Sequence, residues 1–181
     1  MDYFEKISKI SHLVPYSKNY KIEEFDCGIP EYNNFLLDEA DQLGNLGVTQ
    51  TQLLINNYTG DIMGYFSLCN ASIQLKDDEK MQHSMKDVPF NSIPCVKIGK
   101  LAVSVNYKEE IKGIGSYLIQ LVLGIASELN ESTGCRFIAV DADIENDKNV
   151  YQFYEKNDFL INEKLKRSKS KTISMRLDIF E

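Results

Sequence analysis

A glycine-bearing turn at the start of an apolar segment is the part of the chain whose residue types best fit a binding site for an anion. The turn reads Lys112, Gly113, Ile114, Gly115, Ser116 and follows a strand-like run. The first N–H groups of a helix lack partners inside the helix and lie at the positive end of its dipole, so they bind anions such as phosphate. Glycines let the backbone approach the anion closely. Gly-x-Gly is also common in loops, so a flexible helix start is the plain alternative.

The composition sets limits on the class of protein. A chain of 181 residues, 43% of them hydrophobic, is expected to form a single domain over residues 1–181 with a buried core. Its formal net charge of -7 argues against a general nucleic-acid binder. The four cysteines form no Cys-x-x-Cys pair, so we expect no metal site and no disulfide framework, but buried free thiols. The sequence shows neither a signal peptide nor a membrane span, which favours the cytoplasm.

The order of the expected elements is that of an α/β domain. The N-terminal segment has room for a strand, and residues 26–30 read as a helix start because proline suits the first helical turn. Apolar residues at helical spacing follow as far as Gly44 and Gly47. Residues 48–55 and 62–75 then read as two antiparallel strands joined by a turn. Residues 76–94 are expected to be a loop or a weak helix, in a position to cover a binding site at the glycine-bearing turn.

The second half of the chain reads as strand, helix and strand, and then as helix and hairpin. The expected elements are strands at 96–104 and 136–142, helices at 115–129 and 149–157, and hairpin strands at 159–165 and 172–179. A strand, helix and strand of this length predict a right-handed parallel crossover.

Two further segments give the turn a family context. The run Leu101-Ala102-Val103 precedes the turn, and Phe153-Tyr154-Glu155-Lys156-Asn157-Asp158-Phe159 follows it. Together they resemble the GNAT family of acetyl-coenzyme A (acetyl-CoA) dependent N-acetyltransferases, over roughly the second half of the chain. The resemblance implies the GNAT fold: an α/β architecture with a central mixed, mostly antiparallel sheet flanked by helices, and a splayed parallel strand pair that holds the cofactor.

The resemblance also implies where acetyl-CoA binds. The pantetheine arm would bind Leu101, Ala102 and Val103 by hydrogen bonds like those of a strand. The pyrophosphate would lie on the N–H groups of Lys112, Gly113, Ile114, Gly115 and Ser116. Glu110 departs from the family pattern, which has Gln or Arg there, and a carboxylate near a pyrophosphate is repulsive unless it points outward. Lys108 and Lys112 offer compensating charge.

Tyr154 is the catalytic residue that the resemblance implies, as the donor to the thiolate leaving group. The alternative is an ordinary core tyrosine packed by its ring. Asn149 matches a family position that contacts the cofactor arm, and helix capping is its alternative role. Asp158 stands where the family usually has glycine.

Two N-terminal and central segments, residues 25–36 and 88–94, resemble the subgroup that includes bacterial GNAT toxins. The resemblance implies acetylation of the α-amino group of aminoacyl-tRNA, and a small DNA-binding antitoxin as partner. Homodimerisation is common in the family. A small-molecule or protein amine as acceptor remains open, as does a non-catalytic CoA-binding module, for which Glu110 is the main support.

No feature of the sequence indicates which residue is the general base, and water is one candidate. His12 and His83 are isolated in the sequence and are expected to have solvent or structural roles. A basic cluster is made up of Lys164, Lys166, Arg167, Lys169 and Lys171. It reads as a solvated hairpin tip, or as a tRNA contact if the acceptor is aminoacyl-tRNA.

Overall fold

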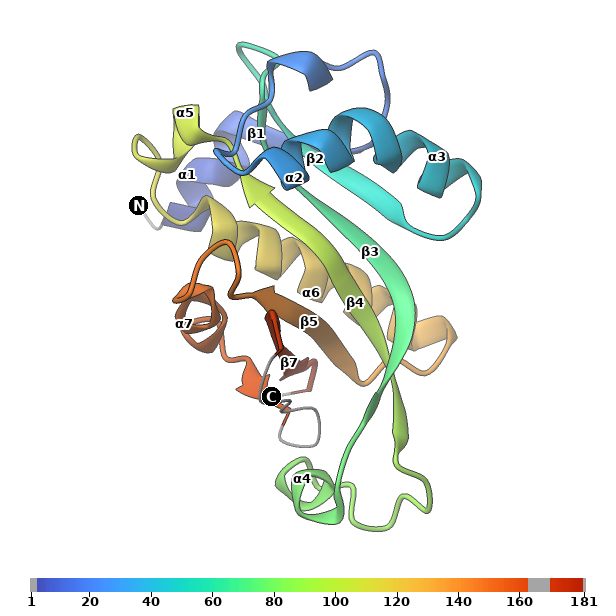
Figure 1. Cartoon of the computed structure of the whole chain (residues 1–181). Helices are drawn as coiled ribbons and strands as arrows, with labels where there is room; N and C mark the ends of the chain where they lie inside the picture. The colour runs from blue at the N-terminus through green and yellow to red at the C-terminus, as the bar shows by residue number, and fades with distance from the viewer. Residues whose placement is uncertain (1–2, 163–169, 181) are drawn as a thin grey trace. The chain divides into compact units, whose positions relative to one another are not determined.

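Seven strands form a sheet within residues 3–162 and 170–180, which the computed structural model describes (Figure 1). Their order is β1-β2-β3-β4-β5-β7-β6. The pairs β1–β2, β2–β3, β5–β7 and β6–β7 are antiparallel, whereas β4–β5 is parallel. The predicted mixed, mostly antiparallel sheet is therefore confirmed. The strands are β1 (Ser11–Pro15), β2 (Gln50–Asn56), β3 (Ile62–Gln74), β4 (Ser92–Val103), β5 (Phe137–Asp143), β6 (Leu160–Ile161) and β7 (Thr172–Asp178).

Helices precede β1, β2, β4, β5 and β6 along the chain, whereas β3 follows β2 directly. They are α1 (Tyr3–Ile10), η1 (Ile22–Glu24), α2 (Pro30–Asn34), η2 (Phe35–Glu39), α3 (Ala40–Asn45), α4 (Asp77–Gln82), α5 (Val105–Lys108), α6 (Ile114–Ser132) and α7 (Val150–Glu155). The expected helices at 115–129 and 149–157 correspond to α6 and α7.

The chain divides into two compact units. The first comprises residues 3–69 and 99–121, and the second comprises residues 70–98, 122–162 and 170–180. β3, β4 and α6 each contribute residues to both units. The expectation of a single domain stays a prediction.

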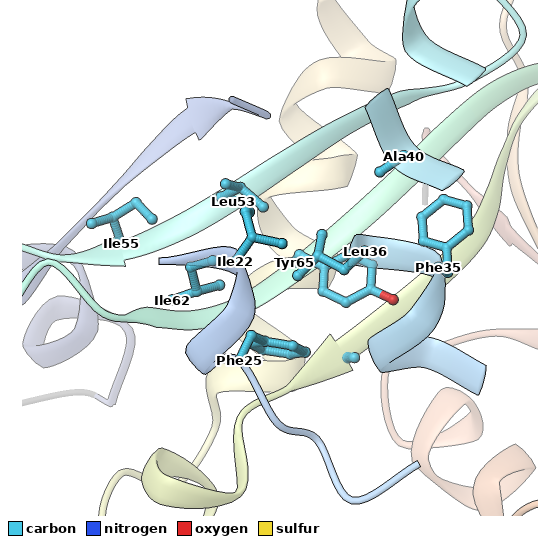
Figure 2. Close-up of a cluster of buried hydrophobic side chains, with 10 residues drawn as sticks. Ile22, Phe25, Phe35, Leu36, Ala40, Leu53, Ile55, Ile62 and Tyr65 are labelled. Atoms are coloured by element: carbon cyan, nitrogen blue, oxygen red, sulfur yellow. The ribbon is translucent and has the colours of Figure 1, made fainter. Parts of the chain in front are cut away.

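The first unit has a core between its N-terminal helices and the strands β2 and β3. Figure 2 shows the side chain of Tyr65, on β3, beside Leu36 and between Phe35 and Phe25. The rings of Phe25 and Phe35 lie 5.4 and 6.1 Å from that of Tyr65, so the aromatic side chains add specific packing to the burial of apolar area. The buried members are Ile22, Phe25, Phe35, Leu36, Ala40, Leu53, Ile55, Ile62, Tyr65 and Ala102.

The predicted helix start before Pro30 is confirmed, and its geometry explains the residue types. The carboxylate of Asp26 accepts hydrogen bonds from the Gly28 N–H (2.7 Å) and from the Asn33 amide (2.8 Å). Gly28 has φ +80°, a left-handed conformation that glycine adopts without strain. The helix that follows is interrupted by the π-helical turn η2, which the apolar spacing does not predict.

The second unit contains the predicted parallel pair, with register from Cys95↔Phe137 to Ile98↔Val140. β4 begins at Ser92 rather than at residue 96, and the segment 76–94 holds the short helix α4. The closing hairpin is present as β6 and β7. The remainder of the first hairpin strand lies outside the described residues, as do Lys164, Lys166, Arg167 and Lys169.

Candidate active site

The end of β4 is the first candidate element and lies in the first unit. Ala102 is buried, and Leu101 and Val103 are half-buried. Beyond the strand, the Ser104 N–H donates to the Met63 carbonyl (2.9 Å) and the Val105 N–H donates to the Asp26 carbonyl (2.9 Å). These bonds hold the end of β4 to β3 and to the segment that precedes α2, so two neighbouring segments determine its backbone position.

The glycine turn belongs to the same unit and starts α6, as the sequence predicts. Gly113 has φ +89°, and its carbonyl accepts the Tyr117 N–H (2.8 Å), so Gly113 directly precedes the first helical turn. Ile114, Gly115 and Ser116 are then the first residues of the helix, and their N–H groups have no partner within it.

The charges around this helix start are compatible with an anion. The first turn of α6 holds no acidic residue. Lys112 and Glu110 are both exposed on the preceding loop. An exposed carboxylate is well screened by water, so Glu110 repels an anion at the helix start less than a buried one would. Lys112 directly precedes Gly113 and offers a positive charge.

Helix α1 packs against this start. The ring of Phe4 lies 5.8 Å from that of Tyr117, and burial raises the pKa of Tyr117. A Cβ added at Gly113 would lie 3.5 Å from Tyr3 Cβ, which is an ordinary contact. The space at Gly113 therefore tolerates a methyl group, and the need for glycine comes from its φ.

Tyr154 lies on α7 in the second unit and is 6% exposed. Its ring makes edge-on contacts with Phe153 and Phe159, at 5.0 and 5.3 Å. Its carbonyl accepts the N–H of Phe159 (3.1 Å), and the Asp158 N–H donates to the Glu155 carbonyl (3.1 Å). These two bonds form a Schellman motif at the C-terminus of α7.

Asp158 takes the left-handed position of that motif, with φ +66°. Glycine usually occupies this position because it has no Cβ, and Asp is among the residues that tolerate it best. Asp158 therefore adopts the turn that glycine would form at this position, although it departs from the family pattern. The motif holds the rings of Tyr154 and Phe159 together and so limits the positions that Tyr154 can take.

Asn149 precedes α7 and is exposed. Its side chain makes no capping hydrogen bond to the helix, while its backbone N–H donates to the Asp147 carboxylate (2.9 Å). Asn149 thus occupies the N-cap position of α7 without the side-chain hydrogen bond that a capping role would supply. A contact with the cofactor arm stays a prediction.

Lys100, which is not among the predicted site residues, lies on β4 one residue before Leu101. The Lys100 ammonium forms an ion pair with Glu31 and lies 4.5 Å from the centre of the Tyr32 ring. The carbonyl of Tyr32 in turn accepts the hydroxyl of Tyr65 (2.8 Å), and burial raises the pKa of Tyr65. Lys100 therefore contacts both Glu31 and the Tyr32 ring. In the sequence, only its position next to residues 101–103 marks it as a residue of interest.

His83 has a structural role, which is one of the two roles expected for it. It is isolated in the sequence but not in the fold. It is buried, with Nδ1 2.8 Å from the Asp178 carboxylate and Nε2 accepting from Arg176 Nε (3.0 Å). Arg176 also forms an ion pair with Glu79 (3.0 Å), and both side chains are buried. This network ties α4 to β7 within the second unit.

The remaining expectations have mixed outcomes. His12 is exposed, with Nδ1 2.6 Å from the Asn57 side-chain oxygen. Cys95 and Cys135 are buried free thiols, as expected, but Cys27 and Cys69 are only half-buried. Among the described residues, no group of three or more His, Cys, Asp or Glu could hold a metal ion. No helix in the described ranges is long and apolar enough to cross a membrane.

Comparisons with known proteins place this geometry among solved folds. No protein-family model matches the chain. A tRNA-acetylating toxin of Mycobacterium tuberculosis is 25% identical over 122 residues, which cover 67% of this chain and 69% of that protein. A tyrosine-to-phenylalanine mutant of KacT has a TM-score of 0.75 at 19% identity, covering 94% of this chain and 96% of that one.

Two further structures carry ligands. AtaTR bound with acetyl-CoA has a TM-score of 0.74 at 18% identity, covering 95% of each chain. AtaT in complex with acetyl-methionyl-tRNA has a TM-score of 0.74 at 18% identity, covering 91% of this chain and 93% of that one. The chain has the fold of the GNAT acetyltransferase toxins.

Proposed function

We propose that the chain is an acetyl-CoA-dependent N-acetyltransferase that acetylates the α-amino group of aminoacyl-tRNA. The observation that carries the proposal is the first unit's combination of a strand end and a glycine-led helix start. Residues 101–103 and 113–116 lie in one compact unit, on a fold shared with a protein solved with acetyl-CoA bound. The tRNA-acetylating toxin from Mycobacterium tuberculosis supports the choice of acceptor.

The residues present fit acetyl-CoA. The N–H groups of Ile114, Gly115 and Ser116 would bind the pyrophosphate, because they are unpaired within the helix and lie at the positive end of its dipole. Lys112 would add a positive charge. The backbone of Leu101, Ala102 and Val103 would bind the pantetheine arm, and Asn149 would contact the same arm. Acetyl-CoA supplies an acetyl group activated as a thioester.

Tyr154 would donate a hydrogen bond to the leaving sulfur. Reference pKa values of ~10 for a phenol and ~8.5 for a thiol make full proton transfer to the leaving sulfur uphill by about 2 kcal/mol. Its hydroxyl therefore contributes by a hydrogen bond to the sulfur as negative charge develops there. The contacts of its ring with Phe153 and Phe159 fix the side chain, which reduces the entropy lost in that step.

The acidic chain must recognise tRNA locally. A net charge of -7 gives no general attraction to phosphates, so we infer that binding depends on the acceptor end and on a few cations. Of the basic cluster, Lys171 lies among the described residues; its side chain is exposed and pairs with Glu145 at 2.6 Å. Such an exposed pair contributes little to stability, so Lys171 can exchange its partner for a phosphate at low cost.

Partners follow from the same likeness. AtaT has been solved with the C-terminus of its antitoxin AtaR, and KacTA with DNA. We propose that this chain likewise has a small DNA-binding antitoxin, forms a homodimer and acts in the cytoplasm, where aminoacyl-tRNA is made.

Transfer of radiolabelled acetyl groups tests the proposed acceptor. The chain is incubated with labelled acetyl-CoA and a mixed pool of charged tRNA, with the same pool deacylated as the control. Label on RNA that depends on charging supports the proposal. If acetyl-CoA binds but no label reaches the RNA, the acceptor is a small-molecule or protein amine. If no amine of any class is labelled, the chain is a non-catalytic CoA-binding module.

A further inference from the structure

A glycine inside β3 lies at the point where β4 and α6 both approach that strand. A Cβ added at Gly64 would lie 2.8 Å from the backbone oxygen of Ala102, 3.1 Å from Leu118 Cδ1 and 3.5 Å from Val103 Cα. The first distance is shorter than Cβ atoms show in real structures. Gly64 has no left-handed φ, so the position requires glycine for space and not for backbone freedom.

The three neighbours of Gly64 belong to the two elements proposed to bind acetyl-CoA. Ala102 and Val103 form the strand end, and Leu118 is fully buried on α6, one turn after Ile114 at the helix start. We propose that Gly64 is a positioning residue that sets the backbone of Ala102 and Val103 for the pantetheine arm. The inference rests on the proposed function and adds a residue that neither the glycine turn nor the family resemblance indicated.

The surroundings determine which neighbour would move if Gly64 carried a side chain. Leu118 Cδ1 is the end of a side chain and can rotate away, whereas the oxygen of Ala102 is part of the backbone. Immediately after Val103, the Ser104 N–H is bonded to the carbonyl of Met63, the residue before Gly64. The strand is thus held at Ser104 and pushed at Ala102, so we expect the peptide groups of residues 102–103 to turn or shift.

A bulge in β3 supports the same conclusion. β2 pairs Leu54 with Gly64 but Ile55 with Ile62, so Met63 is the extra residue. Bulges redirect a strand locally and are frequent beside active sites. Here the carbonyl of the extra residue holds Ser104 while the neighbouring glycine leaves room for Ala102. The two features lie on consecutive residues of β3, Met63 and Gly64, and act on the chain on either side of Val103.

The test compares Gly64→Ala with Gly99→Ala. Gly99 is on β4, and a Cβ there would meet only the Ser67 oxygen at 3.7 Å, an ordinary contact. Calorimetry measures the Kd of acetyl-CoA and of 3′-phosphoadenosine 5′-diphosphate, which lacks the pantetheine arm. We expect Gly64→Ala to weaken acetyl-CoA at least about 10-fold, or about 1.4 kcal/mol. Its effect on the nucleotide fragment, and the effect of Gly99→Ala on either ligand, should stay within about 2-fold, or about 0.4 kcal/mol.

A second pair of variants covers the case in which Gly64→Ala does not fold. Leu118→Ala relieves the side-chain contact but leaves the backbone contact with Ala102. We expect Gly64→Ala combined with Leu118→Ala to bind acetyl-CoA about 10-fold more weakly than Leu118→Ala alone. Equal affinities in either comparison, or an equal loss for the nucleotide fragment, would overturn the inference. Failure of the wild type to bind acetyl-CoA would instead overturn the proposed function.

Discussion

Replacing Gly113 by alanine separates the role of the helix start in binding from its role in folding. At φ +89°, an L-residue in the left-handed region costs about 1–2 kcal/mol, so the variant should lose that much free energy of unfolding or relax its backbone. Relaxation turns the peptide group that joins Gly113 to Ile114 and moves its N–H away from the proposed pyrophosphate. A hydrogen bond to a charged group contributes about 1.5–3 kcal/mol, so acetyl-CoA should bind roughly 10- to 100-fold more weakly.

Gly47→Ala is the matched control. Gly47 has φ +69°, lies in the same unit and has no atom within 4 Å of an added Cβ. It carries the same backbone penalty at a distance in sequence from α6. Urea unfolding should show a similar loss of stability for both variants, while calorimetry should show weaker acetyl-CoA binding for Gly113→Ala alone. Equal affinity of the two variants would refute the proposed role of the α6 start.

Three other predictions concern catalysis, pH and the buried network. Tyr154→Phe should lower kcat about 100-fold or more with nearly unchanged acetyl-CoA affinity, and Tyr151→Phe on the same helix should keep both; full activity of Tyr154→Phe would remove that residue from the mechanism. The hydrogen bonds that Asp26 accepts, first from the Gly28 N–H and then from the Asn33 amide, lower its pKa in the folded chain. The ionised carboxylate therefore stabilises the fold above the pKa of an unfolded aspartate, near 3.9, and this contribution is lost as the pH falls through the folded pKa. Urea midpoints should therefore fall less steeply below about pH 4 in Asp26→Asn than in the wild type, and parallel curves would contradict the assignment. Glu79→Ala should cost about 3 kcal/mol or more in urea unfolding because Arg176 stays buried without that carboxylate, and a cost under about 1 kcal/mol would show that the ion pair is dispensable.

The local parts of the fold follow from the sequence. The start of α2 at Pro30, the start of α6 at Ile114 and the parallel pairing of β4 with β5 rest on short-range signals: proline, glycine and the length of a crossover. Asp158 illustrates the limit of prediction from such short-range signals. Its departure from glycine is visible in the sequence, but only the structure shows that it still adopts the left-handed turn.

Long-range features could not be predicted in the same way. Arg176 and His83 are 93 residues apart and meet only when β7 and the end of α4 are in place. Arginine is usually exposed, so nothing in the local sequence marks Arg176 as buried. Gly64 lies in a continuous apolar run whose pattern gives no hint that a carbonyl from β4 occupies the space beside it. The π-helical turn η2 likewise has apolar residues at ordinary helical spacing.

Mass spectrometry of the amino acid released from tRNA shows directly whether the chain acetylates aminoacyl-tRNA. Charged tRNA is incubated with acetyl-CoA and the wild-type chain, and the ester to the amino acid is then cleaved with mild base. If the chain acetylates aminoacyl-tRNA, the released amino acid carries one acetyl group on its α-nitrogen, and this product forms only when both acetyl-CoA and the chain are present. Recovery of the unmodified amino acid alone, under conditions in which the same chain binds acetyl-CoA, would contradict the assignment of aminoacyl-tRNA as the acceptor.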